Sequence, residues 1–394
     1  MKLLVVSSSF PMKLGDGLSP FIWEYCVHLK KRGWDVTVIV PHHRGLERED
    51  IWNGIIIKRF KYLPQRLEDL AYSGGIMPGI KEKPWKTIKV PFFIYSMYKE
   101  ALAFLNRDDF DLVNFHWLFP VCFWLGRFSR RSGVPVVLTA HGTDVHLALK
   151  KPFSMFADKG LKKSAALTLN SRYMKDLLKE FDLPERTEII PMGVDTEKFH
   201  PGSHKPSGSR KIIFLGRLIK QKGIEILLDA FSSALRKAPE AELEIIGYGP
   251  EKDDLARKVK QLRIEGSVSL CDRVSYAELP ERYGGARALA LPSLIPEGLG
   301  MTAVEAGACG VPTVTFGLGG TSETVVDGET GLVVDQSRES LADGLIRILT
   351  DDDLAGRLGE NARKKVVEQY SWDVISKKFD KLFRQIIEEP AEGK

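Results

Sequence analysis

Short apolar runs alternate with amphipathic segments along the chain, and the alternation falls into two halves of similar pattern. A strand-like run, a segment of helical periodicity and a second strand-like run predict parallel strands joined by a crossover helix. In the first half we expect buried strands over residues 1–7, 35–40, 110–117 and 134–140. We expect helices over residues 20–32 and 121–131, with Ser19 and Pro20 as N-cap and first residue of the earlier one.

The second half repeats this alternation after a polar stretch. Residues 200–209 are rich in Gly, Pro and Ser, the composition of an exposed connector, so we place the hinge between two domains near them. Beyond it, strands are expected over residues 211–215, 242–246, 267–270 and 288–291. Helices are expected over residues 223–237, 252–261, 340–350 and 372–388. The pattern therefore predicts two doubly wound α/β domains.

Length and composition agree with this division. A chain of 394 residues exceeds the usual size of one compact core. The chain is 43% hydrophobic and 28% charged, which is typical of a folded globular protein and excludes wholesale disorder. It has no run of about 18 apolar residues that could cross a bilayer, and no secretory signal follows its short apolar start. We therefore expect a cytoplasmic protein.

Positive charge is concentrated in the first half. Residues 1–190 contain 29 Lys and Arg against 20 Asp and Glu, whereas residues 191–394 contain 28 against 32. This asymmetry favours an anionic partner such as a phospholipid surface over a nucleic acid. The segment Lys81 to Lys99 interleaves lysines with aromatic residues, and two interpretations stay open. It is either a covering helix with solvated lysines or a segment that contacts the cytoplasmic membrane face peripherally.

Two glutamates, Glu297 and Glu305, bracket a glycine-rich stretch that follows the expected strand 288–291. The glycines between them interrupt a continuous helix, so we expect Glu297 in a loop and Glu305 on the helix that follows. Backbone amides at the start of such a helix bind anions. In a second interpretation, Thr302 and Glu305 form a capping box and Glu305 satisfies a helix amide instead.

A second strand-to-loop exit carries positive charge. The expected strand 211–215 is followed by Arg217 and Lys222. A guanidinium offers bidentate hydrogen bonds and an ammonium group a compact charge, which together suit a diphosphate held without a metal ion. The other interpretation is that both are solvated charges at a helix start, as Lys220 is expected to be. Taken with the paired glutamates, these residues predict a diphosphate clamp.

These two segments resemble those of the retaining nucleotide-sugar glycosyltransferases of glycosyltransferase family 4. Further marks of the resemblance lie at residues 15–17, 139–144, 191–195 and 331–334. The resemblance implies the GT-B fold, in which two Rossmann-like α/β domains face an interdomain cleft. The implied divisions are an N-terminal acceptor-side domain over 1–190, a donor domain over 191–371, and a C-terminal helix and tail over 372–394 that return to the first domain.

The resemblance also implies roles for single residues. Arg217 and Lys222 would hold the donor diphosphate, Glu297 would contact the donor-sugar hydroxyls, and Glu305 would accept hydrogen bonds from the ribose diol. His141 would align the transferred sugar with the acceptor and completes the expected catalytic set of His141, Arg217, Lys222 and Glu297. The other expected donor contacts are Gly17, Gly298, Leu299, Gly300 and Met301. The residues expected on the acceptor side are Gly15 and Asp144.

Some positions have a second interpretation or depart from the family pattern. His141 follows the strand 134–140 at its carboxyl end, where open α/β sheets bind ligands, but a structural histidine would also fit there. His116 ends another strand and is assigned to the wall or to packing, outside the catalytic set. Leu299 stands where the family commonly has phenylalanine. Asp16 separates two glycines that the family usually has side by side.

We expect neither a metal ion nor a cofactor. Asp109 and Asp111 match a DxD pattern that holds a metal ion in another glycosyltransferase fold, but they precede a strand and lie far in sequence from the clamp. No compact set of His, Asp and Glu suggests a catalytic metal, and the four cysteines lack metal-ligand spacing.

The sequence as a whole predicts transfer of a hexosyl group from a nucleoside-diphosphate sugar, UDP- or GDP-linked, to an acceptor hydroxyl. The acceptor is expected to be a sugar, a lipid-linked molecule or a small molecule, and the anomeric configuration to be retained. One alternative is a sugar phosphorylase of similar fold, although no lysine motif for pyridoxal phosphate is evident. Another is a noncatalytic nucleotide-sugar sensor. A nicotinamide oxidoreductase is disfavoured because no GxGxxG follows a strand.

Overall fold

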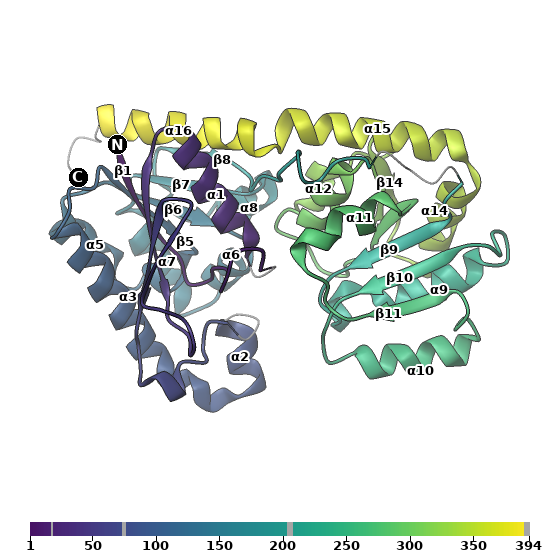
Figure 1. Cartoon of the computed structure of the whole chain (residues 1–394), viewed down its shortest axis with the longest axis horizontal. Coiled ribbons are helices and arrows are strands. Elements are labelled where there is room, and N and C mark those ends of the chain that lie inside the picture. The colour runs from purple at the N-terminus through teal and green to yellow at the C-terminus, as the bar shows by residue number, and fades with distance from the viewer. Residues whose placement is uncertain (17–18, 73–75, 203–207, 390–394) are drawn as a thin grey trace. The chain divides into compact units, whose positions relative to one another are not determined.

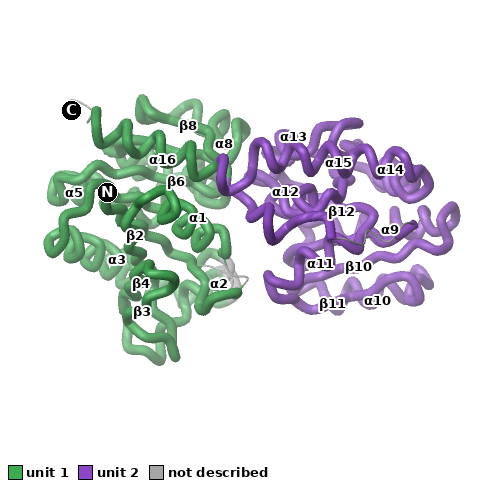
Figure 2. The backbone as a smooth tube through the Cα atoms, turned by 45° about the horizontal axis from the view of Figure 1, so that its top comes forward, with its two compact units in different colours: residues 1–191, 375–394 green, residues 192–374 purple. Residues whose placement is uncertain are grey.

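The computed structural model describes residues 1–16, 19–72, 76–202 and 208–389. Within it the chain forms two compact units, coloured separately in Figure 2. Unit 1 combines Met1–Pro191 with Ile375–Lys394, and unit 2 is Met192–Val374. The boundary falls upstream of the polar stretch 200–209 where we expected the hinge, and residues 203–207 of that stretch lie outside the described residues.

Unit 1 is built on an eight-stranded sheet of order β3-β4-β2-β1-β5-β6-β7-β8 (Figure 1). Neighbouring strands pair in parallel except β3 and β4, which form an antiparallel hairpin. The strands are β1 (Lys2–Val6), β2 (Asp35–Pro41), β3 (Glu49–Trp52), β4 (Ile55–Phe60), β5 (Leu112–His116), β6 (Val136–Ala140), β7 (Ala166–Leu169) and β8 (Thr187–Ile189).

Helices connect these strands and cover the sheet. They are α1 (Pro20–Lys31), α2 (Ile76–Glu82), α3 (Val90–Leu105), α4 (Leu118–Val121), α5 (Leu125–Ser132), α6 (Thr143–Ala148), α7 (Phe153–Leu161) and α8 (Arg172–Leu177), with 3₁₀ turns η1 (Gln65–Leu67) and η2 (Pro84–Lys89). The last helix, α16 (Trp372–Glu388), starts in unit 2 and continues into unit 1. Of the described helices, none combines the length and hydrophobicity that a bilayer-spanning segment needs.

Unit 2 contains a six-stranded, fully parallel sheet of order β11-β10-β9-β12-β13-β14. Its strands are β9 (Lys211–Leu215), β10 (Glu242–Ile246), β11 (Val268–Cys271), β12 (Ala288–Leu291), β13 (Thr313–Thr315) and β14 (Gly331–Val333). Its helices are α9 (Ile224–Ala234), α10 (Lys252–Leu262), α11 (Leu279–Gly284), α12 (Met301–Ala308), α13 (Thr321–Thr324), α14 (Arg338–Thr350) and α15 (Asp352–Gln369), with 3₁₀ turns η3 (Lys220–Lys222) and η4 (Tyr276–Glu278).

The strand orders locate the edges at which ligands are expected. In unit 1 the chain runs outward from β1 to β2 and later adds β5 on the other side of β1; in unit 2, β12 is added beside β9 in the same way. Open α/β sheets bind ligands outside the carboxyl ends of the strands at such a reversal. The central strands are buried on both faces, which explains why they read as unbroken apolar runs.

Four predicted elements have the observed bounds: β9, β10, β12 and α16. The other predicted strands and helices differ at their ends. Ser19 does occupy the N-cap position of α1, but it does not cap the helix with its side chain; its hydroxyl pairs with that of Ser9 at 2.6 Å.

Between residues 49 and 105 the sequence predicted no regular element except the covering helix that was one interpretation of Lys81 to Lys99. The structure has the β3–β4 hairpin, α2 and α3 there. The hairpin turn is Asn53–Gly54, with φ of 49° and 72°, a turn sequence that strongly favours a two-residue hairpin loop. Pro84 is the first residue of η2 and Pro91 the second residue of α3, so each proline lies in the first turn of its own helix and interrupts neither. Helix α15 was also not expected.

Candidate functional site

The loop after β9 and the loop after β12 lie at the strand reversal of unit 2. The Leu294 N–H donates to the carbonyl of Gln221 at 2.8 Å, which joins the two loops. Gly223 has a φ of 67°, and a Cβ at this position would lie 2.0 Å from the Pro292 carbonyl oxygen. Only glycine at position 223 therefore lets the loop after β9 lie this close to the loop after β12.

Lys222 and Glu297 meet where these loops join. The Lys222 Nζ lies 2.5 Å from Oε1 of Glu297, and the Ser293 hydroxyl donates to the same oxygen. The Lys222 and Glu297 side chains are 21% and 20% exposed, so the pair is accessible without being fully solvated. This arrangement pairs the cation expected at the diphosphate with the carboxylate expected at the sugar.

A third loop fixes the backbone of Glu297. The Glu297 N–H donates to the Leu318 carbonyl at 3.2 Å, and the Gly320 N–H donates to the Glu297 carbonyl at 2.8 Å. A Cβ on Gly319 or Gly320 would lie 2.6 or 2.3 Å from a carbonyl oxygen of the Glu297 loop. The loop after β13 thus supports the loop that carries the carboxylate.

Arg217 lies on the loop after β9, in the same segment as Lys222. Its side chain is exposed and has no hydrogen bond or ion pair within the described ranges. The backbone beside it is held, because the Leu218 N–H donates to the Tyr248 carbonyl at 2.8 Å. The guanidinium is therefore free to reach an anion from a fixed loop.

Helix α12 begins beside these cations. Its N-cap is Gly300, with a φ of 83° and no side-chain cap, so no side chain satisfies the first amides of the helix. Leu299 is buried, whereas Gly298 and Met301 are half-buried. The glycines place Glu297 in the loop and Glu305 on α12, as predicted. An uncapped helix start next to Lys222 gives this edge of the sheet a positive field.

The capping-box interpretation of Glu305 is wrong, because α12 begins before Thr302 and the Glu305 carboxylate has another partner. The Tyr283 hydroxyl donates to Oε2 of Glu305 at 3.1 Å. Burial raises the pKa of Glu305 to about 7, against the opposing effect of that hydrogen bond. Glu305 therefore keeps one carboxylate oxygen outside the Tyr283 hydrogen bond, in an apolar surrounding.

Unit 1 has a histidine pair at its own strand ends. His116 ends β5 and His141 follows β6; His116 Nδ1 lies 3.0 Å from His141 Nε2, and the rings stack at 5.2 Å. Burial lowers the pKa of His141 to about 3, and burial together with His141 lowers that of His116 well below its usual value. Both imidazoles are therefore neutral near pH 7. Nε2 of His116 and Nδ1 of His141 have no hydrogen-bond partner among the described residues.

Asp144 fixes the backbone around this pair. Its Oδ1 accepts the N–H groups of His141 and Gly142 at 3.0 and 2.9 Å, and its Oδ2 accepts that of Leu118 at 2.9 Å. Burial raises the pKa of Asp144 although these backbone donors oppose the shift. Asp144 thus joins the loop after β5 to the loop after β6.

The remaining expected residues lie in the loop after β1. Gly15 is exposed with a φ of 82°, and Gly17 lies outside the described residues. Asp16 Oδ2 accepts the Met12 N–H at 3.1 Å.

The acidic motif at residues 109–111 lies at the opposite end of the sheet from the histidine pair. Asp111 accepts the Lys2 N–H at 2.6 Å, and Asp109 is exposed before β5.

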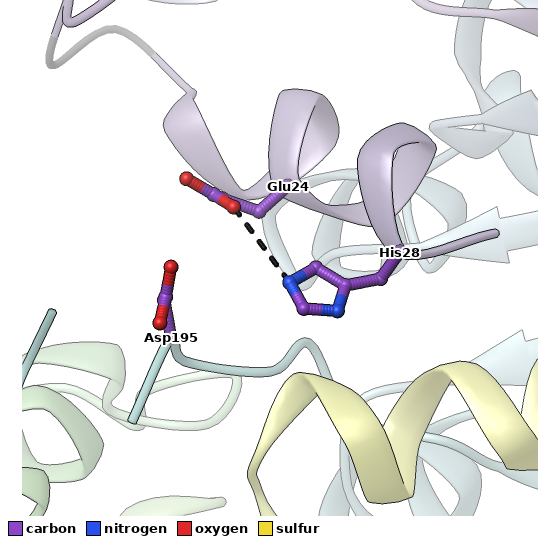
Figure 3. Close-up of side chains that lie close together, drawn as sticks. All are labelled: Glu24, His28 and Asp195. Atoms are coloured by element: carbon purple, nitrogen blue, oxygen red, sulfur yellow. Dashed lines mark ion pairs between the residues drawn. The ribbon is translucent and has the colours of Figure 1, made fainter. Parts of the chain in front are cut away.

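On α1, Glu24 and His28 form a pair at 3.9 Å with the four-residue spacing of neighbours on one helix face (Figure 3).

Two families of known proteins match the chain. The one described as "Glycosyltransferase Family 4" matches residues 15–198, and the one described as "Glycosyl transferases group 1" matches residues 195–365. The chain is a glycosyltransferase of the family 4 type. The predicted GT-B fold is confirmed by the two α/β units, whose sheets are parallel apart from the β3–β4 hairpin, and by the similar solved structures.

The glycosyltransferase is 26% identical over 393 residues to the GDP-mannose-dependent α-(1-6)-phosphatidylinositol monomannoside mannosyltransferase of Mycolicibacterium smegmatis, covering 94% of this chain and 95% of that protein. It resembles the sucrose-phosphate synthase of Thermosynechococcus elongatus with a TM-score of 0.80 and 21% identity, over 98% of this chain and 100% of that one. It also resembles Anabaena Alr3699/HepE, solved with UDP-glucose, with a TM-score of 0.72 and 18% identity, over 98% and 100% of the chains.

The sequence missed two side chains that contact the candidate residues of the glycosyltransferase, Ser293 and Tyr283. Ser293 precedes Glu297 by four positions, so its place in the same loop was a usable signal. His116, which the sequence analysis assigned to the wall or to packing, lies against His141, and the shared strand-end position indicated that the two could meet. Tyr283 lies on a different helix from Glu305, and nothing in the local sequence connects them.

Proposed function

We propose that the glycosyltransferase transfers a hexosyl group from a nucleoside-diphosphate sugar to an acceptor hydroxyl with retention of anomeric configuration. The Lys222–Glu297 pair at the strand reversal of unit 2 carries this proposal. It sets a cation and a hydrogen-bond acceptor side by side, which are the groups that a diphosphate and an attached sugar require. We assign the donor to unit 2 and the acceptor to unit 1.

In this proposal Lys222 and Arg217 neutralise the leaving nucleoside diphosphate without a metal ion. Negative charge grows on the phosphate oxygens as the sugar–oxygen bond breaks, and fixed cations stabilise that charge. The uncapped first turn of α12 adds backbone amides from the same side. Glu305 accepts hydrogen bonds from the ribose diol with the oxygen that Tyr283 does not occupy.

Glu297 holds the transferred sugar in this proposal. When a donor binds, its phosphate takes over the ammonium of Lys222, and the Glu297 carboxylate accepts hydrogen bonds from the sugar hydroxyls. The acceptor oxygen bonds to the anomeric carbon on the face from which the diphosphate leaves, and its proton passes to a departing phosphate oxygen. Glu297 then orients the sugar and is not itself the nucleophile.

His141 acts as a neutral group on the acceptor side. Because burial holds its pKa near 3, it cannot supply a positive charge near neutral pH. It contributes hydrogen bonding and shape, with its ring orientation held by His116 and its backbone by Asp144. Gly15 and Gly17 belong to the same proposed acceptor side.

Two similar proteins suggest which substrates to propose. The Mycolicibacterium relative is named for GDP-mannose and a phosphatidylinositol mannoside, and the Anabaena neighbour was solved with UDP-glucose. We therefore propose a UDP- or GDP-linked hexose as donor and a lipid-linked acceptor presented at the cytoplasmic face of a membrane. The product would be a glycolipid or a precursor of a surface polysaccharide.

A panel of nucleotide sugars tests this function by thermal stabilisation and by product formation. A bound donor should raise the unfolding temperature by mass action, and one donor should also be consumed. With that donor, Lys222→Ala is expected to lower kcat by about 10²–10³ because it removes a fixed charge from the transition state. The control is Lys220→Ala, which changes an exposed lysine of the same 3₁₀ turn and should leave kcat within about twofold.

Two outcomes would contradict the proposal. Full turnover by both Lys222→Ala and Arg217→Ala would show that these two residues do not hold the donor diphosphate. Stabilisation by a donor without any product, with every acceptor class supplied, would indicate a noncatalytic sensor.

A further inference from the structure

Unit 1 has a stripe of large apolar side chains on its surface. Trp85, Ile88, Phe92 and Tyr95 are 54%, 73%, 53% and 62% exposed. Their spacing of three and four residues places them along one side of η2 and the start of α3. We call these four residues the aromatic stripe.

The opposite side of α3 already forms part of the core. Phe93, Met97 and Ala101 are fully buried there. The helix therefore has two apolar faces, and the described chain covers only one of them. Contiguous exposed apolar side chains of this size mark an interaction surface.

The lysines between the stripe residues point inward. Lys86 and Lys89 are about 5% exposed, and their ammonium groups lie 3.3 and 2.6 Å from the Asp69 carboxylate. The same groups donate to the carbonyls of Asp69 and Leu67. The Lys89 Nζ also lies 4.5 Å from the centre of the Trp85 ring. The expectation of solvated lysines is wrong at these two positions, because Asp69 pairs with both and they anchor η2.

The rim of the stripe is positive. Arg66, Lys83 and Lys99 are exposed, and residues 83–99 contain no Asp or Glu. Tryptophan and tyrosine prefer the interface between lipid headgroups and acyl chains, and lysine and arginine around them attract anionic lipids. A surface that combines these two chemistries fits a bilayer better than the mixed charges of an average protein surface.

We infer that the aromatic stripe docks unit 1 onto the interface of an anionic lipid bilayer. The stripe enters the headgroup region, and Arg66, Lys83 and Lys99 meet lipid phosphates around it. This inference rests on the proposed function in one respect, since a bilayer is where a lipid-linked acceptor would be presented. The docking itself needs neither donor nor acceptor.

Cosedimentation of the full chain with vesicles tests the inference. Vesicles of phosphatidylcholine with added phosphatidylglycerol should bind the protein, and vesicles of phosphatidylcholine alone should bind it more weakly. Ile88→Ser is expected to lower the partition coefficient roughly tenfold, because the most exposed side chain of the stripe no longer enters the bilayer. Lys83→Glu together with Lys99→Glu should weaken binding to the anionic vesicles only.

The control is Val367→Ser, which changes an exposed branched apolar residue on α15 of unit 2 and should bind as the unaltered protein does. Donor turnover without vesicles should be the same for Ile88→Ser and the unaltered protein, so loss of docking is separable from loss of catalysis. The inference fails if the unaltered protein does not bind anionic vesicles, or if Ile88→Ser binds equally well. It also fails if the protein forms a dimer that Ile88→Ser abolishes, which would assign the stripe to a second copy.

Discussion

Burial shifts the pKa of two candidate side chains in this glycosyltransferase. Glu297 is accessible and paired with Lys222, whereas Glu305 is buried with the Tyr283 hydroxyl and has a pKa of about 7. Burial likewise keeps His141 neutral at physiological pH. The environment therefore decides the charge state of Glu305 and His141, and the residue type alone does not.

Glu305→Gln should change how stability depends on pH. The folded protein binds a proton at Glu305 more tightly than the unfolded chain does, because burial raises the pKa from 4.5 to about 7. The free energy of unfolding should therefore fall by about 3 kcal/mol as pH rises through that window. In Glu305→Gln this fall should be absent, which denaturant unfolding at pH 5 and pH 8 would measure.

The control is Glu360→Gln, at an exposed position of α15, which should keep the pH dependence of the unaltered protein. If the free energy of unfolding had the same pH dependence in Glu305→Gln and in the unaltered protein, the raised pKa of Glu305 would be contradicted.

At the scale of elements, the proposed donor site depends on three loops that support one another at the carboxyl ends of β9, β12 and β13. Backbone hydrogen bonds join Gln221 to Leu294 and Glu297 to Gly320. Such bonds hold a loop only while the backbones stay close, and glycine makes that approach feasible. The loops are therefore sensitive to a single added methyl group.

Gly320→Ala should disturb this support. Its Cβ would lie 2.3 Å from the Gly298 carbonyl oxygen, so the loop that carries Glu297 must move. We expect a higher KM for the donor, a lower kcat and a loss of about 1–3 kcal/mol in the free energy of unfolding. Steady-state kinetics and denaturant unfolding measure both effects.

Gly356→Ala is the matched substitution in α15, where nothing lies within 4 Å of the added Cβ. It should raise stability by about 0.5–1 kcal/mol and leave the kinetics unchanged. Normal kinetics in Gly320→Ala would show that the loop contact is unimportant.

At the scale of the whole molecule, the C-terminal helix completes unit 1. The chain returns to unit 1 through α16, whose Phe379 and Phe383 pack edge-on against Tyr25 and Trp34 at 5.0 and 5.7 Å. The Trp34 indole donates to Asp380 at 2.8 Å. Unit 1 therefore depends on residues that follow unit 2 in the chain.

Phe383→Ala should destabilise unit 1 by about 3–5 kcal/mol, because it leaves a cavity at a fully buried position. Chemical unfolding followed by circular dichroism should show the transition of unit 1 at lower denaturant concentration. Lys381→Ala, exposed on the same helix, should stay within about 0.5 kcal/mol of the unaltered protein. Equal midpoints for the two variants would mean that α16 does not contribute to the core of unit 1.

The sequence predicted the parts of the fold that local pattern controls. Strands β9 and β12 have the predicted bounds because strands buried on both faces are nearly continuous apolar runs between turn residues. The β3–β4 hairpin was missed, although Asn53–Gly54 was a usable signal. The start of α3 was obscured because proline reads as a helix breaker but also suits a first turn.

The sequence by itself determined the alternation of strand and helix in each half, the two strand exits of unit 2 and the family. It could do so because the spacing of apolar residues, the positions of glycines and the placement of charges are all visible within a few neighbouring residues. Only the tertiary structure decided that Lys222 meets Glu297 across 75 positions, that Tyr283 meets Glu305, and that Lys86 and Lys89 turn toward Asp69. Those contacts depend on how distant segments pack, and burial at the contact then sets the charge of each group.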